Sequence, residues 1–188
     1  MRAIHQIHIN KTGGTTVGKA LGLKFRHVDA SDLVAELGED GFDEAFIFSF
    51  VRNPWDRVVS HYHWRIKTNQ TGLGDAPIPF KEWVKACFDR REPPYYDKPK
   101  MFRQQTDWLQ SNSEKPVHPD VDFIGRFETL HKDIGRLSEI LDISVSDIPH
   151  LKPSGRQRDY RPYYDAQTQA IIARAFATDI EVFGYTFD

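Results

Sequence analysis

The sequence predicts an α/β fold, a single domain in which helices flank a small parallel β-sheet of about three or four strands. Two observations predict this fold. Short strand-like segments alternate with turns and helix-like segments, which is the order of βαβ units. One of these segments, residues 45–51 (AFIFSFV), is almost continuously apolar, which is typical of a strand buried on both faces of a parallel sheet. The length of 188 residues suits one domain with one core.

The first strand–turn–helix unit lies at the start of the chain. Residues 3–9 (AIHQIHI) alternate between apolar and polar side chains, which indicates a strand. A turn rich in glycine and threonine follows at 10–16, and a short helix is predicted at 17–23. A second helix is expected at 30–37, where Asp29 would cap the N-terminus and the glycine after the helix would end it.

The second unit begins with the apolar strand at 45–51. Arg52 and Asn53 follow it, and Pro54 stands where the first helical residue is expected. Apolar residues at helical spacing extend this predicted helix from Pro54 to Ile66.

The middle of the chain, residues 67–119, is rich in Pro, Gly, Asp and Asn, so we expect a loop-rich insert that carries a binding function. Helices and one more strand follow from the same periodicity rules. The elements predicted here are helices at 80–89, 101–109, 129–141 and 165–182, a strand at 122–127 and a basic, irregular segment at 150–162.

Composition excludes several classes of protein. The formal net charge of -2 argues against a strongly basic nucleic-acid binder, so no nucleic acid is expected as a partner. Cys87 is the single cysteine, which excludes an internal disulfide and a cysteine-based zinc site. The first ten residues are too short and polar for a signal peptide, and no apolar run approaches the roughly 20 residues of a membrane span. A cytoplasmic location is expected, and no oligomeric state is predicted.

The turn after the first strand is typical of an anion site. Glycines let backbone N–H groups approach an anion, threonines add hydroxyl donors, and Lys11 adds a cation. A Walker A loop is an alternative, because Gly13, Gly18 and Lys19 have its spacing. Ala20, however, stands where that loop needs Ser or Thr to bind Mg²⁺. A glycine turn without a ligand is the second alternative.

The segment after the second strand adds a phosphate-binding pattern. Arg52 leaves the carboxyl end of a buried strand, which is where open α/β sheets bind their ligands. Its guanidinium suits bidentate contact with a phosphate. Ser60 lies eight residues further on, about two helical turns away. We expect Arg52 and Ser60 to reach one phosphate together if the chain bends at Asn53 and Pro54.

These segments resemble the nucleotide motifs of a known family. HINKTGGTT (residues 8–16) and FVRNPWDRVVSHYHW (50–64) are similar to the two nucleotide motifs of the sulfotransferases that use 3′-phosphoadenosine 5′-phosphosulfate (PAPS) as donor. The nearest branch is sulfotransferase family 2, which includes carbohydrate sulfotransferases. Residues 122–130 and 163–187 also resemble that branch. The resemblance therefore implies a P-loop-NTPase-like sulfotransferase fold over residues 1–188.

The resemblance also implies which residues hold the donor. In that family the first motif holds the 5′-phosphosulfate and the second motif holds the 3′-phosphate, without a metal. Arg52 and Ser60 would form the 3′ site. The 5′ site would consist of Lys11, Thr12, Gly13, Gly14, Thr15 and Thr16.

One departure from the family concerns a late loop. Cytosolic sulfotransferases carry an Arg-Lys-Gly loop beside the 3′-phosphate, and this chain lacks it. Basic residues of the 150–162 segment could replace that loop or could form a solvated loop instead. These residues are Lys152, Arg156, Arg158 and Arg161.

Sulfuryl transfer needs a cation beside the leaving phosphate and a base for the proton of the acceptor. The resemblance supports Lys11 as the cation. Histidine suits the base because it titrates near neutral pH. Related carbohydrate sulfotransferases have a histidine in a stretch comparable to the one that contains His27, so His27 is the first candidate. His61, His63 and a carboxylate stay open as alternatives.

The acceptor is expected, from the resemblance, to be a hydroxyl or amine of a glycan or glycoconjugate, with a lipid-linked sugar or a small metabolite as alternatives. The insert at 67–119 would form its pocket, where Arg103, Gln104 and Gln105 could contact it. Two other functions stay open, a P-loop-type nucleotide kinase or triphosphatase and a non-catalytic nucleotide-binding module. Mg²⁺-dependent ATP hydrolysis would indicate the first, and insensitivity to substitution of Lys11 the second.

Overall fold

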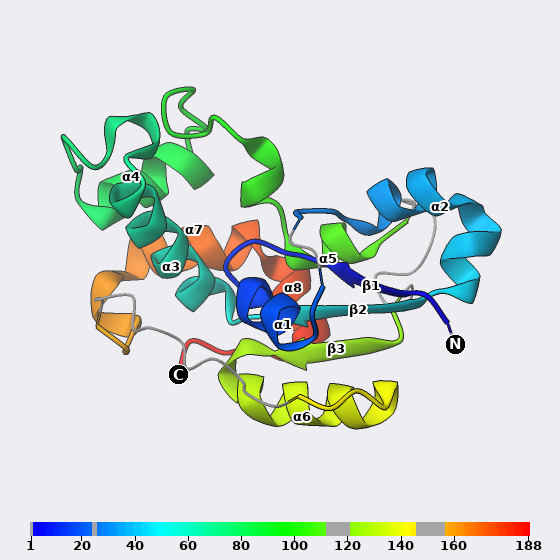
Figure 1. The fold of residues 1–188 in the computed structure, drawn as a ribbon. Helices are drawn as coiled ribbons and strands as arrows, with labels where there is room; N and C mark the ends of the chain where they lie inside the picture. Colours follow the sequence, from blue (N-terminus) through cyan, green and yellow to red (C-terminus); the bar gives the residue numbers. More distant parts are fainter. Residues whose placement is uncertain (1, 24–25, 112–120, 146–156) are drawn as a thin grey trace. The chain divides into compact units, whose positions relative to one another are not determined.

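The computed structural model describes residues 2–23, 26–111, 121–145 and 157–188 (Figure 1). Contacts between residues divide the chain into two compact units. The first unit comprises Met1–Arg52 and Gln105–Leu151, and the second comprises Asn53–Gln104 and Lys152–Asp188.

The first unit contains a parallel three-stranded sheet with the order β1-β2-β3. The strands are β1 (Ile4–Ile7), β2 (Phe46–Val51) and β3 (Phe123–Arg126). β2 is central, and its last five residues are buried, as expected for a strand covered on both faces. The predicted α/β fold with a small parallel sheet is therefore confirmed.

Helices surround this sheet. They are α1 (Gly14–Ala20), α2 (Ala30–Glu44), α5 (Gln105–Leu109) and α6 (Leu130–Leu141), with a 3-10 turn at Phe127–Thr129. α6 runs alongside β3 in Figure 1. Its Ile134 and Leu137 pack in one hydrophobic cluster with Val17 of α1 and with Phe48 and Phe50 of β2. The core of this unit therefore lies between these helices and the sheet.

The second helix is longer than the sequence predicts. Asp29 caps it as expected, in a reciprocal capping box with Asp32. Gly38, predicted to end the helix, has φ 76° and ψ 165°, so the backbone kinks there and the helix resumes to Glu44. Glycine permits this left-handed conformation without ending the element.

The second unit is helical. Its helices are α3 (Pro54–Lys67), α4 (Phe80–Phe88), α7 (Ala166–Ala175) and α8 (Ala177–Phe183), with 3-10 turns at Gln70–Gly72, Pro99–Phe102 and Arg161–Tyr163. Trp55 of α3, Trp83 of α4 and Ile172 of α7 share its hydrophobic core. The part of the 67–119 insert that lies in this unit therefore supplies core residues.

Two predicted helices are each divided in the structure. The helix expected at 165–182 separates into α7 and α8 at Phe176, whose φ of -123° and ψ of 31° interrupt the helical geometry. The helix expected at 101–109 becomes a 3-10 turn followed by α5. Arg103 lies between them in an extended conformation with ψ 159°, which a continuous helix cannot contain.

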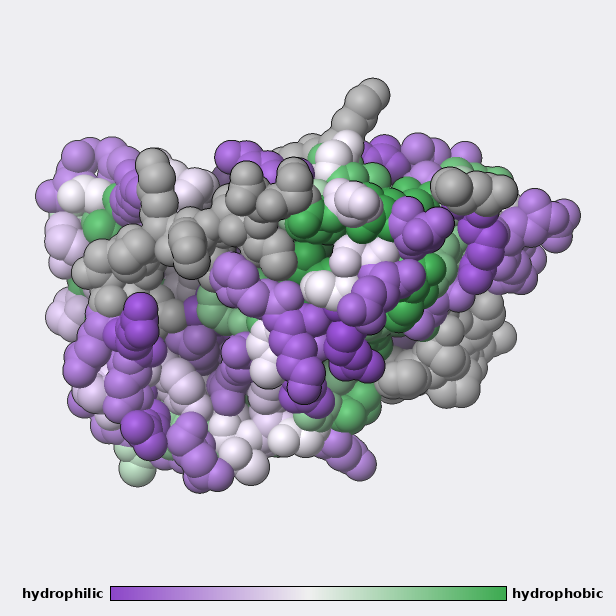
Figure 2. Space-filling view, turned by 60° about the horizontal axis from the view of Figure 1, so that its bottom comes forward, coloured by the Kyte–Doolittle hydropathy of each residue, from purple (hydrophilic) through white to green (hydrophobic). Residues whose placement is uncertain are grey.

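Hydrophilic side chains cover much of the face in Figure 2, and hydrophobic residues gather in one part of that face. Among the described residues, the exposed large hydrophobic side chains are Trp64, Ile140 and Val182. None of the helices in the described ranges combines the length and the apolar character needed to cross a lipid bilayer.

Candidate functional site

The turn after β1 is closed mainly by its own atoms. The Thr12 hydroxyl is buried and donates to the Ile9 carbonyl at 3.0 Å. The Gly13 carbonyl accepts from the Thr16 backbone N–H at 2.9 Å, which begins α1. Lys11 and Gly13 both have left-handed backbones, with φ 67° and 87°. A non-glycine residue such as Lys11 rarely adopts this conformation, so the turn is tightly determined.

Neighbouring side chains require both glycines of this turn. A Cβ atom on Gly14 would lie 2.3 Å from two atoms of the His8 ring. A Cβ atom on Gly13 would lie 3.1 Å from the Phe127 side chain, on a backbone that already disfavours any other residue. From the sequence, these glycines were explained by the close approach of an anion to the backbone. The contacts with His8 and Phe127 are by themselves sufficient to require glycine at both positions.

His8 and His27 lie against each other beside this turn. Their ring centroids are 4.5 Å apart. His8 is buried, and its pKa is lowered from 6.5 to about 3. Burial is the larger cause of this shift, and electrostatic repulsion from His27 is the smaller one. His8 is therefore neutral at physiological pH.

The backbone of His8 assigns a tautomer to the exposed ring of His27. The Nδ1 atom of His27 lies 2.9 Å from the His8 carbonyl oxygen. Since a carbonyl only accepts hydrogen bonds, Nδ1 carries the hydrogen. In the neutral ring of His27, Nε2 then has a lone pair that can accept a proton.

Arg52 joins the turn after β1 to the end of β2. Its Nη1 donates to the Lys11 carbonyl at 3.0 Å. Its guanidinium carbon lies 3.7 Å from the centroid of the Phe127 ring, which is a cation–π contact. The residue is 4% exposed. The two segments that predict nucleotide binding therefore meet through a direct hydrogen bond within the first unit.

The Gln105 amide holds the backbone of Arg52. Its Oε1 accepts from the Arg52 N–H at 2.8 Å, and its Nε2 donates to the Arg52 carbonyl at 2.9 Å. Gln105 is completely buried, so the expectation that its side chain reads an acceptor is wrong. Sequence reasoning missed the role of Gln105 at this site, because no local pattern links residues 53 positions apart.

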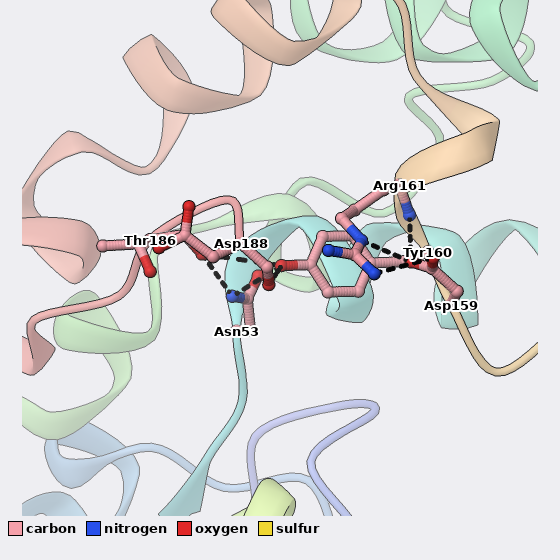
Figure 3. Close-up of polar contacts among 6 residues, drawn as sticks. All are labelled: Asn53, Asp159, Tyr160, Arg161, Thr186 and Asp188. Atoms are coloured by element: carbon pink, nitrogen blue, oxygen red, sulfur yellow. Dashed lines mark hydrogen bonds and ion pairs between the residues drawn. The ribbon is translucent and has the colours of Figure 1, made fainter.

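Asn53, the next residue, is held by the second unit (Figure 3). Its Oδ1 caps α3 by accepting from the Trp55 N–H at 3.1 Å. Its Nδ2 donates to the Thr186 carbonyl at 2.8 Å and to the Tyr160 hydroxyl at 3.2 Å. The start of α3 is therefore fixed by residues more than 100 positions away.

Ser60 lies on α3 in the second unit and is 9% exposed. Arg52 belongs to the first unit, so a phosphate shared by Arg52 and Ser60 stays a prediction.

The two threonines at the start of α1 differ in exposure. Thr15 is exposed, whereas Thr16 is largely buried.

The alternative bases belong to the aromatic packing of the second unit. The buried His61 ring lies 4.9 Å from the Phe102 ring and 5.8 Å from the Trp83 ring, measured between centroids. The Nε2 atom of His63 lies 3.0 Å from the Tyr163 hydroxyl oxygen. His27, in contrast, lies in the same unit as Lys11.

The basic segment is described only in part. Lys152 and Arg156 lie outside the described residues. Arg161 forms a two-pronged ion pair with Asp159, at 2.8 and 3.0 Å (Figure 3). A role for this segment at the 3′-phosphate stays a prediction.

In the described ranges there is no group of three or more His, Cys, Asp or Glu residues arranged to hold a metal ion. Cys87 is buried, and this burial raises the pKa of its thiol. The thiol is therefore protonated at neutral pH and is not a nucleophile.

Comparisons with known proteins match this chain to one family. The profile described as "Sulfotransferase family" matches residues 3–186. An uncharacterized protein of Archaeoglobus fulgidus is 33% identical over 116 residues, which cover 58% of this chain and 83% of that protein. A sulfotransferase crystal structure from Alicyclobacillus acidocaldarius is similar over 84% of this chain, with 18% identity and a TM-score of 0.47. The match spans 60% of that solved chain, which is less than two thirds of its length.

Proposed function

Because the chain belongs to the sulfotransferase family, we propose that it transfers a sulfuryl group from PAPS to a hydroxyl or amine of an acceptor. The observation that carries this proposal is the hydrogen bond from the Arg52 guanidinium to the Lys11 carbonyl. It joins the turn that was predicted to bind an anion with the segment that was predicted to bind a phosphate, and the family resemblance implies that these hold the 5′ and 3′ ends of one nucleotide.

The donor would lie at the carboxyl ends of β1 and β2, where open α/β sheets bind ligands. Arg52 and Ser60 would hold the 3′-phosphate, and the planar guanidinium of Arg52 suits two parallel hydrogen bonds to it. The 5′-phosphosulfate would be held by Lys11, Thr12, Gly13, Gly14, Thr15 and Thr16. The Thr12 hydroxyl already donates to Ile9, so its backbone N–H is the better donor to the ligand.

The reaction is an in-line displacement at sulfur. The acceptor oxygen or nitrogen forms a bond to sulfur while the bond between sulfur and the bridging phosphate oxygen breaks, and the bonding electrons stay on that oxygen. The Lys11 ammonium would stabilise this negative charge. His27 would take the acceptor proton on Nε2, and its Nδ1 contact with the His8 carbonyl supports that assignment.

A carbohydrate is the proposed acceptor, from the likeness to the carbohydrate branch of the family. The chemistry needs no metal, because PAPS already carries an activated sulfuryl group. The ATP-dependent alternative needs a Mg²⁺ ligand at the position that Ala20 occupies.

Calorimetric titration with 3′-phosphoadenosine 5′-phosphate (PAP) tests the donor site, with 5′-AMP and ATP–Mg²⁺ as controls. We expect micromolar binding of PAP and much weaker binding of the two controls. Preference for ATP–Mg²⁺ would support the kinase or triphosphatase alternative. Absence of binding by all three nucleotides would contradict the proposed function.

A further inference from the structure

We propose that Gln105 is a positioning residue of the donor site, which fixes the Arg52 backbone and so holds the Arg52 guanidinium between the Lys11 turn and the 3′-phosphate. The inference rests on the proposed function and deepens it. It assigns to a fully buried residue of α5 control over recognition of the 3′-phosphate.

The Gln105 side chain contacts the Arg52 backbone directly. Arg52 is the first residue after β2. A single side-chain amide satisfies both polar groups of its backbone, with distances of 2.8 Å to the nitrogen and 2.9 Å to the oxygen. Glutamine suits this position because its amide contains one acceptor and one donor group on the same end.

Burial makes this pair of bonds important. Gln105 is 0% exposed and Arg52 is 4% exposed, so water cannot readily replace a lost partner. A buried backbone N–H or carbonyl that loses its hydrogen bond is costly. We therefore expect the Arg52 backbone to move when the amide is removed.

Movement of that backbone would be transmitted to both ends of the donor. The Arg52 side chain is fixed at 3.0 Å from the Lys11 carbonyl and at 3.7 Å from the Phe127 ring. Lys11 has a rarely populated backbone conformation that neighbouring contacts must maintain. Displacement of Arg52 by a fraction of an ångström would loosen this contact and misdirect the guanidinium.

The test compares the affinities for PAP and 5′-AMP, because their ratio isolates the contribution of the 3′-phosphate. Gln105→Met keeps the length of the side chain and removes both hydrogen bonds. We expect it to reduce the wild-type preference for PAP by about 10-fold or more, with a smaller change in 5′-AMP affinity.

Gln104→Met is the matched control. Gln104 also holds a backbone group, since its Oε1 accepts from the Thr178 N–H at 2.9 Å, but that contact lies in the second unit. If general destabilisation were the cause, both variants would lose affinity for both nucleotides. We expect Gln104→Met to keep the wild-type preference for PAP.

Gln105→Glu keeps the inference testable if Gln105→Met does not fold. A protonated carboxyl group has one donor and one acceptor, as the amide has, whereas the carboxylate only accepts. Measured relative to wild type at each pH, the PAP preference of Gln105→Glu should be low at pH 8 and should recover as the pH falls toward 5.5. Absence of this recovery would contradict the inference.

The outcomes separate this inference from the proposed function. If wild type prefers PAP and folded Gln105→Met has the same preference, the role of Gln105 is wrong and the donor site stands. If wild type binds PAP no better than 5′-AMP, the proposed function fails and the inference fails with it.

Discussion

The turns after β1 and β2 bring the candidate site together, but they are held in different ways. The first turn is closed mainly within a few residues, by the Thr12 hydroxyl and by the carbonyl of Gly13, although Arg52 also donates to its Lys11 carbonyl. The second turn has partners from distant parts of the chain. Gln105 holds Arg52 across 53 positions, and Thr186 holds Asn53 across 133 positions.

The two turns should therefore respond to different kinds of change. A substitution within the first turn acts on a local, strained backbone. The second turn depends on packing in each unit, because Arg52 is held by the first unit and Asn53 by the second. Three substitutions and one change of pH test this contrast.

The largest effect is expected for Lys11→Ala in the first turn. Loss of the cation beside the leaving phosphate should lower turnover by about 100-fold or more, with a smaller change in PAP affinity. Turnover of PAPS with an accepted carbohydrate and calorimetry with PAP measure the two quantities. Lys19→Ala, at the end of α1, is the control and should behave as wild type. The reverse pattern would support the Walker A interpretation.

Gly14→Ala should destabilise the first turn by about 1–3 kcal/mol, because the new Cβ would lie 2.3 Å from the His8 ring. Chemical denaturation measures the free energy of unfolding. Gly18→Ala is the matched control on α1, where the new Cβ would lie at an ordinary 3.5 Å from Oε1 of Gln6. That variant should be unchanged or slightly more stable, since alanine favours a helix. Equal loss in both variants would contradict the steric explanation.

Asn53→Ala should cost about 1–2 kcal/mol of stability, because it removes the cap of α3 together with the contacts to Tyr160 and Thr186. Tyr160→Phe removes only the hydroxyl contacts, so a smaller loss is expected. Thermal unfolding ranks the two variants. A stability of Asn53→Ala equal to that of wild type would show that the second turn does not depend on this distant anchor.

The smallest effect is a pH dependence that arises at His8. Its folded-state pKa, about 3, is depressed from 6.5, so the unfolded state binds a proton that the folded state does not bind. The contribution to stability is complete above pH 6.5 and is lost as the pH falls toward 3. Between pH 7 and pH 5.5 we expect a loss of about 1 kcal/mol, which His8→Asn should abolish. An unchanged pH dependence in His8→Asn would contradict this assignment.

The same contrast explains what the sequence could predict. The strand at 45–51, the Asp29 cap and the helix that begins at Pro54 follow from local patterns, and the structure contains all three. The Gly/Thr turn could also be predicted, because the residues that favour a turn are adjacent in the sequence.

Long-range contacts could not be predicted in this way. The contact between the Gln105 amide and Arg52 depends on how α5 packs, and periodicity carries no information about it. The sequence offered one explanation for Gly14, the approach of an anion. The closeness of Gly14 to the His8 ring is apparent only from the structure. The break at Phe176 also follows no local helix-stop signal.

Titration of wild type and Arg52→Ala with PAP and 5′-AMP tests most directly whether the two turns form one nucleotide site. We predict that wild type prefers PAP and that Arg52→Ala loses about 10-fold or more in PAP affinity, with a smaller loss for 5′-AMP. An Arg52→Ala variant that binds PAP as tightly as wild type would contradict the assignment of Arg52 to the 3′-phosphate and, with it, the shared site.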